Sequence, residues 1–475
     1  MKKTLQLSKI LVFLLLLGLI LITCDEGGDK GANPPQPPQP PQPGANVNNP
    51  IDRIEITNLG TMTSSASGWR QLLNSIESTG KYINLDLSAC TMTGTSFNPD
   101  SSVETGKKYI VSIILPTVAT GIGGGFQYFS NLNYVKGANI ITIGGSSFSY
   151  SYVKSVDFPK VESIGGSAFF RCSLENVNFP QVTTIGGWAF EDSRLKTATF
   201  PKVQSIGESA FSGCSYLENI SFPASAELGL SSGNYSNPFT DCSKVTFTLT
   251  GTGSLSAIEN RKALVRNGTI LLAYPSASGN ITMNNITSLD GKVFSNCGSI
   301  TDINLPQVTS IGNRAFAFCY NIQDVNFPKA TIIGEYAFSD CTRLQSANFP
   351  LATTVGSYAF YSSSNLMILN IPSVTEIESY AFSSTGNTEL SITMGSTSPT
   401  LGRYMFDYMT TAKTVRVKVP TGATGYTPFS GSSVTVSGDN AVGNWANGFR
   451  GGGWDGAALG WGTINQSITL IIQRQ

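Results

Sequence analysis

The chain has 475 residues, with 30 basic side chains, 30 acidic side chains and no histidine. A zero net charge without a basic field argues against nucleic acid as a partner, and the missing histidine excludes Ser-His-Asp, Cys-His and His-based metal sites. Paired carboxylates would still allow glycosidase chemistry. Because the acids are scattered over the sequence, we expect no enzyme, no cofactor and no metal.

The N-terminal segment is organised like a secretory signal, with a basic start and an apolar run from Ile10 to Ile22. The run is shorter than the about 20 residues that span a bilayer, and Leu21–Cys24 resembles a lipobox. We therefore predict a lipoprotein-type signal peptide over residues 1–23 and lipidation of Cys24. This predicts a cell-envelope protein, lipid-anchored in the membrane and surface-exposed on the outer membrane. Cleaved secretion without lipid and an uncleaved anchor are the alternatives.

Residues 24–50 form a polar, Pro/Gln-rich tether that contains three copies of Pro-Pro-Gln. Such a run favours polyproline II, with a rise of about 3.1 Å per residue. The tether can therefore hold the rest of the chain away from the membrane. A stand-off arm and an unselected spacer have the same reach, and the sequence leaves both open.

An N-terminal cap is predicted over residues 51–107. Trp69, Leu72, Leu73 and Ile76 have helical spacing, and Tyr82–Leu87 alternates like a strand. A repeat array needs such a cap because its first coil would otherwise expose the apolar core and a strand edge. An amphipathic helix that binds a partner is the alternative.

A Phe-Pro pair then recurs every 21 or 22 residues, followed by Ile/Val-Gly and Ala-Phe. A period in the 20s predicts a solenoid, here over residues 108–420, with one short parallel strand per coil before each Phe-Pro. The proline ends the strand, and the glycine is expected to let the backbone turn. The aromatic residues of this pattern include Phe158, Phe169, Phe179, Phe190, Phe200, Phe211, Phe222, Phe316, Phe327, Phe338, Phe349, Phe360 and Phe382.

One coil shows the pattern in full, with Leu174-Glu-Asn-Val-Asn-Phe-Pro followed by Ile185-Gly186 and Ala189-Phe190. It resembles the BspA-type leucine-rich repeats of bacterial surface antigens. The resemblance implies a right-handed leucine-rich-repeat horseshoe with an irregular convex side, a short N-cap helix and a β C-cap. It also implies adhesion to host matrix or to other cells through an extracellular protein ligand, and we expect a monomer.

The repeat is interrupted near residues 224–278, where the apolar segment Ile270–Tyr274 has no place in a 22-residue coil. This stretch is similar to an irregular coil with a hairpin in the same family. Long insertions in repeat proteins often carry function. A tolerated excursion explains the insertion equally well.

Residues 421–475 are predicted to form a C-terminal cap rich in glycine and tryptophan, with strands near Val434–Val436 and Ile468–Ile472. Two interpretations of its aromatic residues remain. They either cover the last coil as a lid or form an aromatic loop that stacks on sugar rings, which makes a glycan a candidate partner. The tryptophans concerned are Trp445, Trp454 and Trp461.

Six cysteines follow a phenylalanine by three positions, and other coils carry serine there. A position that accepts Cys or Ser requires a small side chain, so we expect reduced, buried thiols. A disulfide between neighbouring coils is the alternative. The cysteines outside the signal region are Cys90, Cys172, Cys214, Cys242, Cys297, Cys319 and Cys341.

Polar residues occupy the strand positions between the apolar ones, and we expect them to form a nearly neutral concave binding face, the polar strand face. It is predicted to hold a ligand through many modest hydrogen bonds, although its side chains can also ladder along the stack. The alternatives to adhesion are an envelope structural or scaffold protein with a bacterial partner and a glycan-binding surface protein. The polar strand face consists of Asn176, Asn178, Thr197, Thr199, Asn219, Ser221, Asp302, Asn304, Asp324, Asn326, Ser346, Asn348 and Asn370.

Overall fold

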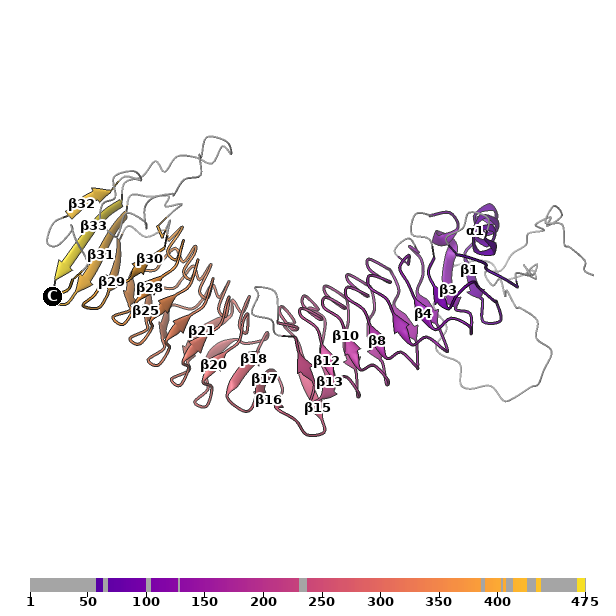
Figure 1. Ribbon diagram of the computed structural model, residues 1–475, viewed down its shortest axis with the longest axis horizontal. Coiled ribbons are helices and arrows are strands. Elements are labelled where there is room, and N and C mark those ends of the chain that lie inside the picture. The colour runs from indigo at the N-terminus through magenta and orange to yellow at the C-terminus, as the bar shows by residue number, and fades with distance from the viewer. Residues whose placement is uncertain are drawn as a thin grey trace, which may run out of the picture. The chain divides into compact units, whose positions relative to one another are not determined.

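The computed structural model describes residues 57–62, 67–99, 104–126, 129–229, 237–385, 389–402, 405–406, 413–424, 433–436 and 468–474. The predicted signal peptide, the predicted tether and the tryptophan-rich segment lie outside these residues. The chain divides into two compact units, Met1–Gly229 and Leu230–Gln475. Each unit is a stack of short, mainly parallel strands (Figure 1).

The first unit begins with α1 (Gly68–Thr79), the only α-helix in the described part of the chain. The helix starts where the Ser67 hydroxyl accepts a hydrogen bond from the Arg70 N–H, and it ends at Gly80 in the left-handed conformation. It buries the four apolar residues whose spacing predicted it. The strand predicted after it is also present, as β1 (Ile83–Asp86).

The coils of the first unit place strands in two rows. The first row precedes the Phe-Pro positions and consists of β1, β3 (Ile110–Ile114), β5 (Tyr134–Lys136), β7 (Ser155–Asp157), β9 (Asn176–Asn178), β11 (Thr197–Thr199) and β13 (Asn219–Pro223); the 3-10 helix η2 (Lys107–Tyr109) leads into β3. The second row consists of β2 (Ser96–Phe97), β4 (Gly121–Ile122), β6 (Thr142–Ile143), β8 (Ser163–Ile164), β10 (Thr184–Ile185), β12 (Ser205–Ile206) and β14 (Glu227–Leu228).

The second unit starts irregularly, with β15 (Thr246–Thr250) and an antiparallel meander of β16 (Leu255–Ile258), β17 (Ala263–Arg266) and β18 (Ile270–Ala273). The strand β18 then pairs in parallel with β20 (Ser288–Leu289). The apolar segment with no place in the repeat is therefore the strand on which the second row of this unit is built.

The second unit also has two rows of strands. The first row consists of β19 (Gly279–Thr282), β21 (Ile300–Asn304), β23 (Asp324–Asn326), β25 (Ser346–Asn348), β27 (Ile368–Asn370), β29 (Glu389–Thr393), β31 (Lys413–Val419) and β33 (Ile468–Arg474), with β32 (Ser433–Val436) antiparallel to β33. The second row adds β22 (Ser310–Ile311), β24 (Ile332–Ile333), β26 (Thr354–Val355), β28 (Glu376–Ile377) and β30 (Thr400–Leu401) to β20.

The predicted strand of each coil is thus confirmed, and the structure adds a second strand at the Ile/Val-Gly position. These second strands have only two residues, so they leave no alternation in the sequence. They are joined by backbone hydrogen bonds between coils, such as Gly186 N to Ile164 O at 2.8 Å.

The repeat glycine has a different role from the predicted one. A Cβ on Gly186 would lie 2.5 Å from the Gly166 nitrogen, and a Cβ on Gly334 would lie 2.7 Å from the Gly312 carbonyl carbon. Neither glycine has a left-handed φ. Glycine is therefore needed because consecutive coils approach closely here. The left-handed turn is made two or three residues later by non-glycine residues such as Trp188 (φ 56°) and Tyr336 (φ 53°).

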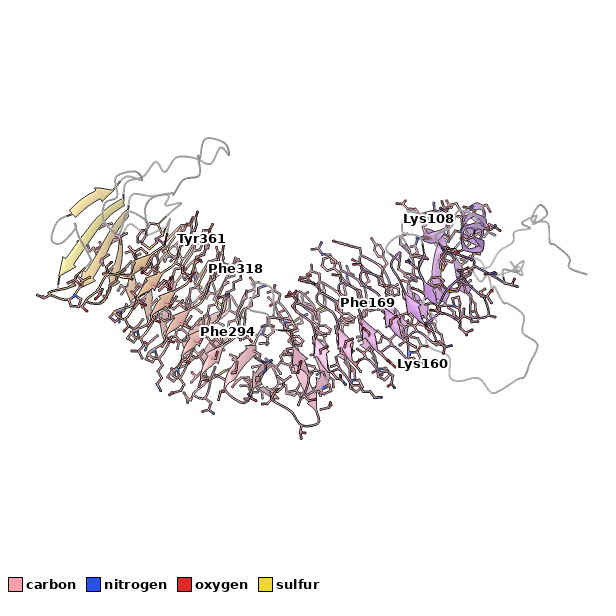
Figure 2. All side chains as sticks on the ribbon, viewed as in Figure 1. Lys108, Lys160, Phe169, Phe294, Phe318 and Tyr361 are labelled. Atoms are coloured by element: carbon pink, nitrogen blue, oxygen red, sulfur yellow. The ribbon has the colours of Figure 1, made fainter. Side chains whose placement is uncertain are left out.

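The interior consists of columns of identical side chains, one per coil. The Ala-Phe rings stack face to face, with centroids 5.1 Å apart for Phe148 and Phe169 and 5.1 Å apart for Phe169 and Phe190. In the second unit Phe294 and Phe316 stack in a corresponding column, with ring centroids 5.1 Å apart. Figure 2 labels Phe169 in the first unit and Phe294 in the second. The phenylalanines of the Phe-Pro pairs are likewise fully buried. Since no coil could bury its own apolar face, the stack supplies the core.

Candidate functional site

The polar strand face is built by the alternation of the first-row strands. In β9 the side chains of Asn176 and Asn178 are exposed while Val177 between them is buried. In β23 Asp324 and Asn326 are exposed around the buried Val325. Successive residues of a strand point to opposite sides, so each strand contributes two outward positions.

The parallel register brings the predicted residues into columns. In the first unit Asn176, Thr197 and Asn219 are partners across β9, β11 and β13. In the second unit Asn326, Asn348 and Asn370 are partners across β23, β25 and β27. The other predicted residues of these strands form parallel columns, and Asp302 and Asn304 lie together on β21.

Hydrogen bonds run along these columns from coil to coil. Asn348 Nδ2 donates to Asn326 Oδ1 at 2.7 Å, and Asn370 Nδ2 donates to Asn348 Oδ1 at 2.6 Å. In the first unit the Thr197 hydroxyl donates to Asn176 Oδ1 at 2.7 Å. The side-chain ladder that the sequence allowed is therefore present.

The ladder leaves hydrogen-bonding capacity on the face. A side-chain amide has two donor hydrogens and two acceptor lone pairs on its oxygen, and Asn348 uses one hydrogen and one lone pair along the column. The remaining hydrogen and lone pair belong to a partly exposed side chain. Because the ladder already fixes the rotamer, a ligand avoids part of the about 0.5–1.5 kcal/mol that ordering such a side chain costs.

Sequence reasoning missed part of the face at the end of the array. Ile368 lies in the column of Ser346 and Asp324, yet its side chain is apolar and 55% exposed. Beyond it, Ser391 and Thr393 of β29 continue the two columns. The coil of β29 has no Phe-Pro pair to mark it, so strand register was the only signal that could have found these residues.

A column of alternating charge borders the face in the first unit, with Lys154, Glu175, Lys196 and Glu218 directly before β7, β9, β11 and β13. Lys196 Nζ lies 2.8 Å from Glu175 Oε2. The hydrogen bond from Lys196 lowers the pKa of Glu175, and the same bond raises the pKa of Lys196. Exposed pairs of this kind contribute little to stability because the solvent screens them.

The family model of the BspA type leucine rich repeat region matches residues 141–261, 276–389 and 331–435, in 6 copies. These matches cover more than half of the chain. The chain belongs to the BspA-type leucine-rich repeat family. No curated protein matches its sequence.

Several solved structures are similar to this BspA-type chain. A leucine rich cell surface protein from Faecalibacterium prausnitzii is 24% identical, with 67% of this chain and 88% of that chain covered and a TM-score of 0.45. A leucine-rich repeat protein from Eubacterium ventriosum is 20% identical, with coverages of 68% and 81% and a TM-score of 0.48. One from Bacteroides ovatus is 20% identical, with coverages of 69% and 83% and a TM-score of 0.44.

In this BspA-type chain the Cys/Ser position of a coil donates a hydrogen bond to the preceding coil. Cys341 Sγ lies 3.1 Å from the Phe316 carbonyl oxygen, and the Ser363 hydroxyl lies 2.7 Å from the Phe338 carbonyl oxygen. All seven described cysteines are buried thiols outside any disulfide, which confirms the expectation. Burial raises the pKa of Cys341 to about 12. The Cys/Ser position therefore requires a small side chain that donates a hydrogen bond, and small size alone is not sufficient.

Other features of the described residues bear on chemistry and location. The described residues contain no group of three or more Cys, Asp or Glu side chains placed to hold a metal ion. None of their helices combines the length and apolarity needed to cross a bilayer. The predicted lipidation site Cys24 and the aromatic residues Trp445, Trp454 and Trp461 lie outside the described residues.

Proposed function

We propose that this protein is a lipid-anchored surface protein of the bacterial cell envelope that uses the polar strand face to bind an extracellular protein, in adhesion to host matrix or to other cells. The observation that carries the proposal is the outward exposure of polar side chains at the same two strand positions in coil after coil. The ladder leaves one donor hydrogen and one acceptor lone pair of Asn348 unused at this surface, and a ligand can take them.

The chemistry of the face supports a protein ligand. Its amides and hydroxyls carry little charge, so a ligand would be held by many hydrogen bonds of about 0.5–1.5 kcal/mol each over a broad area. The ladder through Asn326, Asn348 and Asn370 holds the donors and acceptors at a spacing of one coil. Such a preorganised row suits an extended or flat polar partner better than a small molecule.

The binding test uses the mature protein against a panel of purified extracellular-matrix proteins and against whole cells. Asn178→Arg places a bulky cation on an exposed position of the face, and we expect it to weaken binding by about tenfold or more. Gln204→Arg adds the same side chain at an exposed position between Phe200-Pro201 and the second row, and it is the matched control. Equal loss in both variants would place the binding site elsewhere.

The anchor is tested separately in cells. Metabolic labelling with a radioactive fatty acid is expected to mark the wild type and the Cys90→Ala variant, which lacks a buried thiol, but not Cys24→Ala. Protease added to intact cells is expected to digest the protein. Resistance to protease in intact cells, with digestion after lysis, would instead favour the envelope scaffold with a bacterial partner.

A further inference from the structure

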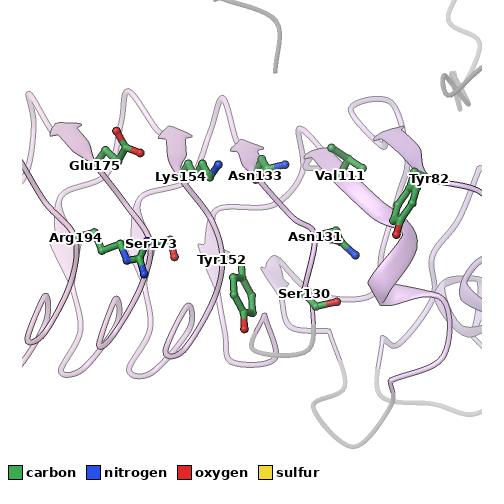
Figure 3. A pocket seen from close by; sticks show the side chains of 10 residues that line it. All are labelled: Tyr82, Val111, Ser130, Asn131, Asn133, Tyr152, Lys154, Ser173, Glu175 and Arg194. Atoms are coloured by element: carbon green, nitrogen blue, oxygen red, sulfur yellow. The ribbon is translucent and has the colours of Figure 1, made fainter. Parts of the chain in front are cut away.

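A second candidate site lies in the first unit, beside the polar strand face. It is a pocket of about 400 Å³ that crosses several neighbouring coils near β1, β3, β5, β7 and β9 (Figure 3). One side is lined by residues directly before these strands, such as Tyr82, Lys154 and Glu175, and the other by residues from the preceding turns, such as Tyr152 and Arg194. Pockets of this size suit one small ligand unit.

The pocket offers two cationic groups. Lys154 and Arg194 both line it and are exposed, and neither side chain makes a hydrogen bond or salt bridge within the described part of the chain. The one carboxylate of the lining, Glu175, is held by Lys196 at 2.8 Å. Glu175 also interacts electrostatically with Lys154 and Arg194. With two cations against one carboxylate, the lining keeps a net positive charge that an anionic group on a ligand would meet.

The pocket also offers aromatic faces. Tyr152 is 56% exposed and Tyr82 is 45% exposed, and both line the pocket. An exposed tyrosine presents an apolar ring face together with a polar hydroxyl. Exposed aromatic rings of this kind suit a ligand with an apolar ring face and a polar rim.

Neutral polar groups complete the lining. Asn131 and Asn133 come from the coil on one side of Tyr152, and Ser173 comes from the coil on the other. Asn131 is held in place because its Nδ2 donates to the Lys108 carbonyl oxygen at 2.8 Å. Amides and hydroxyls on both sides match the alternating donors and acceptors of sugar hydroxyls.

We infer that this pocket binds an acidic sugar unit, a hexose that carries a carboxylate or a sulfate, within a polysaccharide chain. The ring lies on Tyr152, the acidic group lies between Lys154 and Arg194, and the hydroxyls bond to the asparagine and serine side chains. An acidic peptide would use the cations but would leave the tyrosine faces and the neutral donors without a matching partner. The site shares no residue with the polar strand face, but Lys154 and Glu175 belong to the charged column that borders this face. The inference differs from the proposed adhesion to proteins in its residues and in its ligand.

The test measures binding of four probes to the mature protein by calorimetry: a heparin-derived sulfated tetrasaccharide, a tetragalacturonate, a neutral cellotetraose and a hexaglutamate peptide. We expect one or both acidic sugars to bind, and the sulfated and carboxylated arms identify the acid. Cellotetraose and hexaglutamate are expected to bind at least about tenfold more weakly. No binding of either acidic sugar, or hexaglutamate binding as tightly as the sugars, overturns the inference.

Two pairs of variants locate the site. Lys154→Met with Arg194→Gln is expected to weaken binding by about tenfold or more, while Lys160→Met with Lys202→Gln removes the same two charges outside the pocket. Tyr152→Ala is expected to weaken binding, while Tyr150→Ala, at a residue that is 55% exposed and outside the lining, is expected to leave it unchanged. If the charge variants inside and outside the pocket lose equal affinity, the binding is nonspecific attraction to a cationic surface. Equal loss of affinity in Tyr152→Ala and Tyr150→Ala would likewise refute the site.

Discussion

Phe338→Ala tests the continuous interior directly. Phe338 is fully buried, and its ring centroid lies 5.1 Å from that of Phe316, 5.5 Å from that of Phe360 and 5.6 Å from that of Phe349. Truncation of a buried phenylalanine to alanine costs about 3–5 kcal/mol, and an aromatic pair contributes about 0.5–1.5 kcal/mol beyond its buried area. Because four rings, those of Phe316, Phe327, Phe349 and Phe360, lose a partner, we expect a loss of about 4–5 kcal/mol in the free energy of unfolding of the second unit.

Urea denaturation followed by circular dichroism measures the loss, and hydrogen exchange with mass spectrometry shows where it falls. Coils of a solenoid contact only their neighbours, so exchange should accelerate most in the coils around Phe338. Peptides from the first unit serve as an internal reference. Tyr320→Ala removes an aromatic side chain that is 46% exposed, and this control should stay within about 0.5 kcal/mol of the wild type.

Two outcomes would contradict the expectation. A decrease below about 1 kcal/mol in the free energy of unfolding would mean that neighbouring side chains fill the cavity left by the ring. A close-packed column of rings should not be able to rearrange in this way. Faster exchange of equal size in both units would mean that the coils do not couple as nearest neighbours.

Four further predictions concern single groups. Cys341→Ser keeps a hydrogen-bond donor to the Phe316 carbonyl oxygen, so urea denaturation should show little change in stability. Cys341→Ala removes the donor and should lower the free energy of unfolding by about 1 kcal/mol. A more stable alanine variant than serine variant would contradict the donor role. Burial raises the pKa of this thiol to about 12, so iodoacetamide near about pH 8 should spare it in the folded protein and modify it after unfolding. Gly334→Ala should lose more than about 1 kcal/mol, because its Cβ would overlap the backbone of the preceding coil, and unchanged thermal stability would sink this reasoning. The pKa of Glu175 is lowered chiefly by its hydrogen bond from Lys196. The pair therefore stabilises the fold at pH values above the ordinary glutamate pKa of about 4.3, and it loses this contribution as the pH falls through the lowered pKa. Curves of unfolding free energy against pH for the wild type and for Glu175→Gln should therefore converge in acid.

The repeat could be recognised in the sequence because each coil places the same residue types at the same buried positions. Phe179 and Phe200 belong to successive Phe-Pro pairs of the repeat, and they lie in one column with ring centroids 6.0 Å apart. The helix around Trp69 could be predicted because its apolar residues are spaced with the helical period. Local periodicity reports which side chains must be buried, and burial dominates the free energy of folding.

The candidate site was predictable only in part. The residues of the polar strand face followed from alternation, but Ile368 and the continuation on β29 depend on register with neighbouring coils. The pocket around Tyr152 was not predicted, because its lining residues occupy different coils and different sides of the turn. The residue types that line the pocket differ from coil to coil and form no repeating pattern, since solvent accepts almost any polar side chain.

The sequence by itself determined the repeat length, the strand before each Phe-Pro pair, the residues of the core and the small side chain at the Cys/Ser position, because each of these is set within one coil by burial and chain geometry. Only the tertiary structure decided the second row of strands, the reason for the glycine, the hydrogen bond that the Cys/Ser position donates, and the pocket between the tyrosines. Each of these depends on the distance between one coil and the next, which arises only when the coils stack.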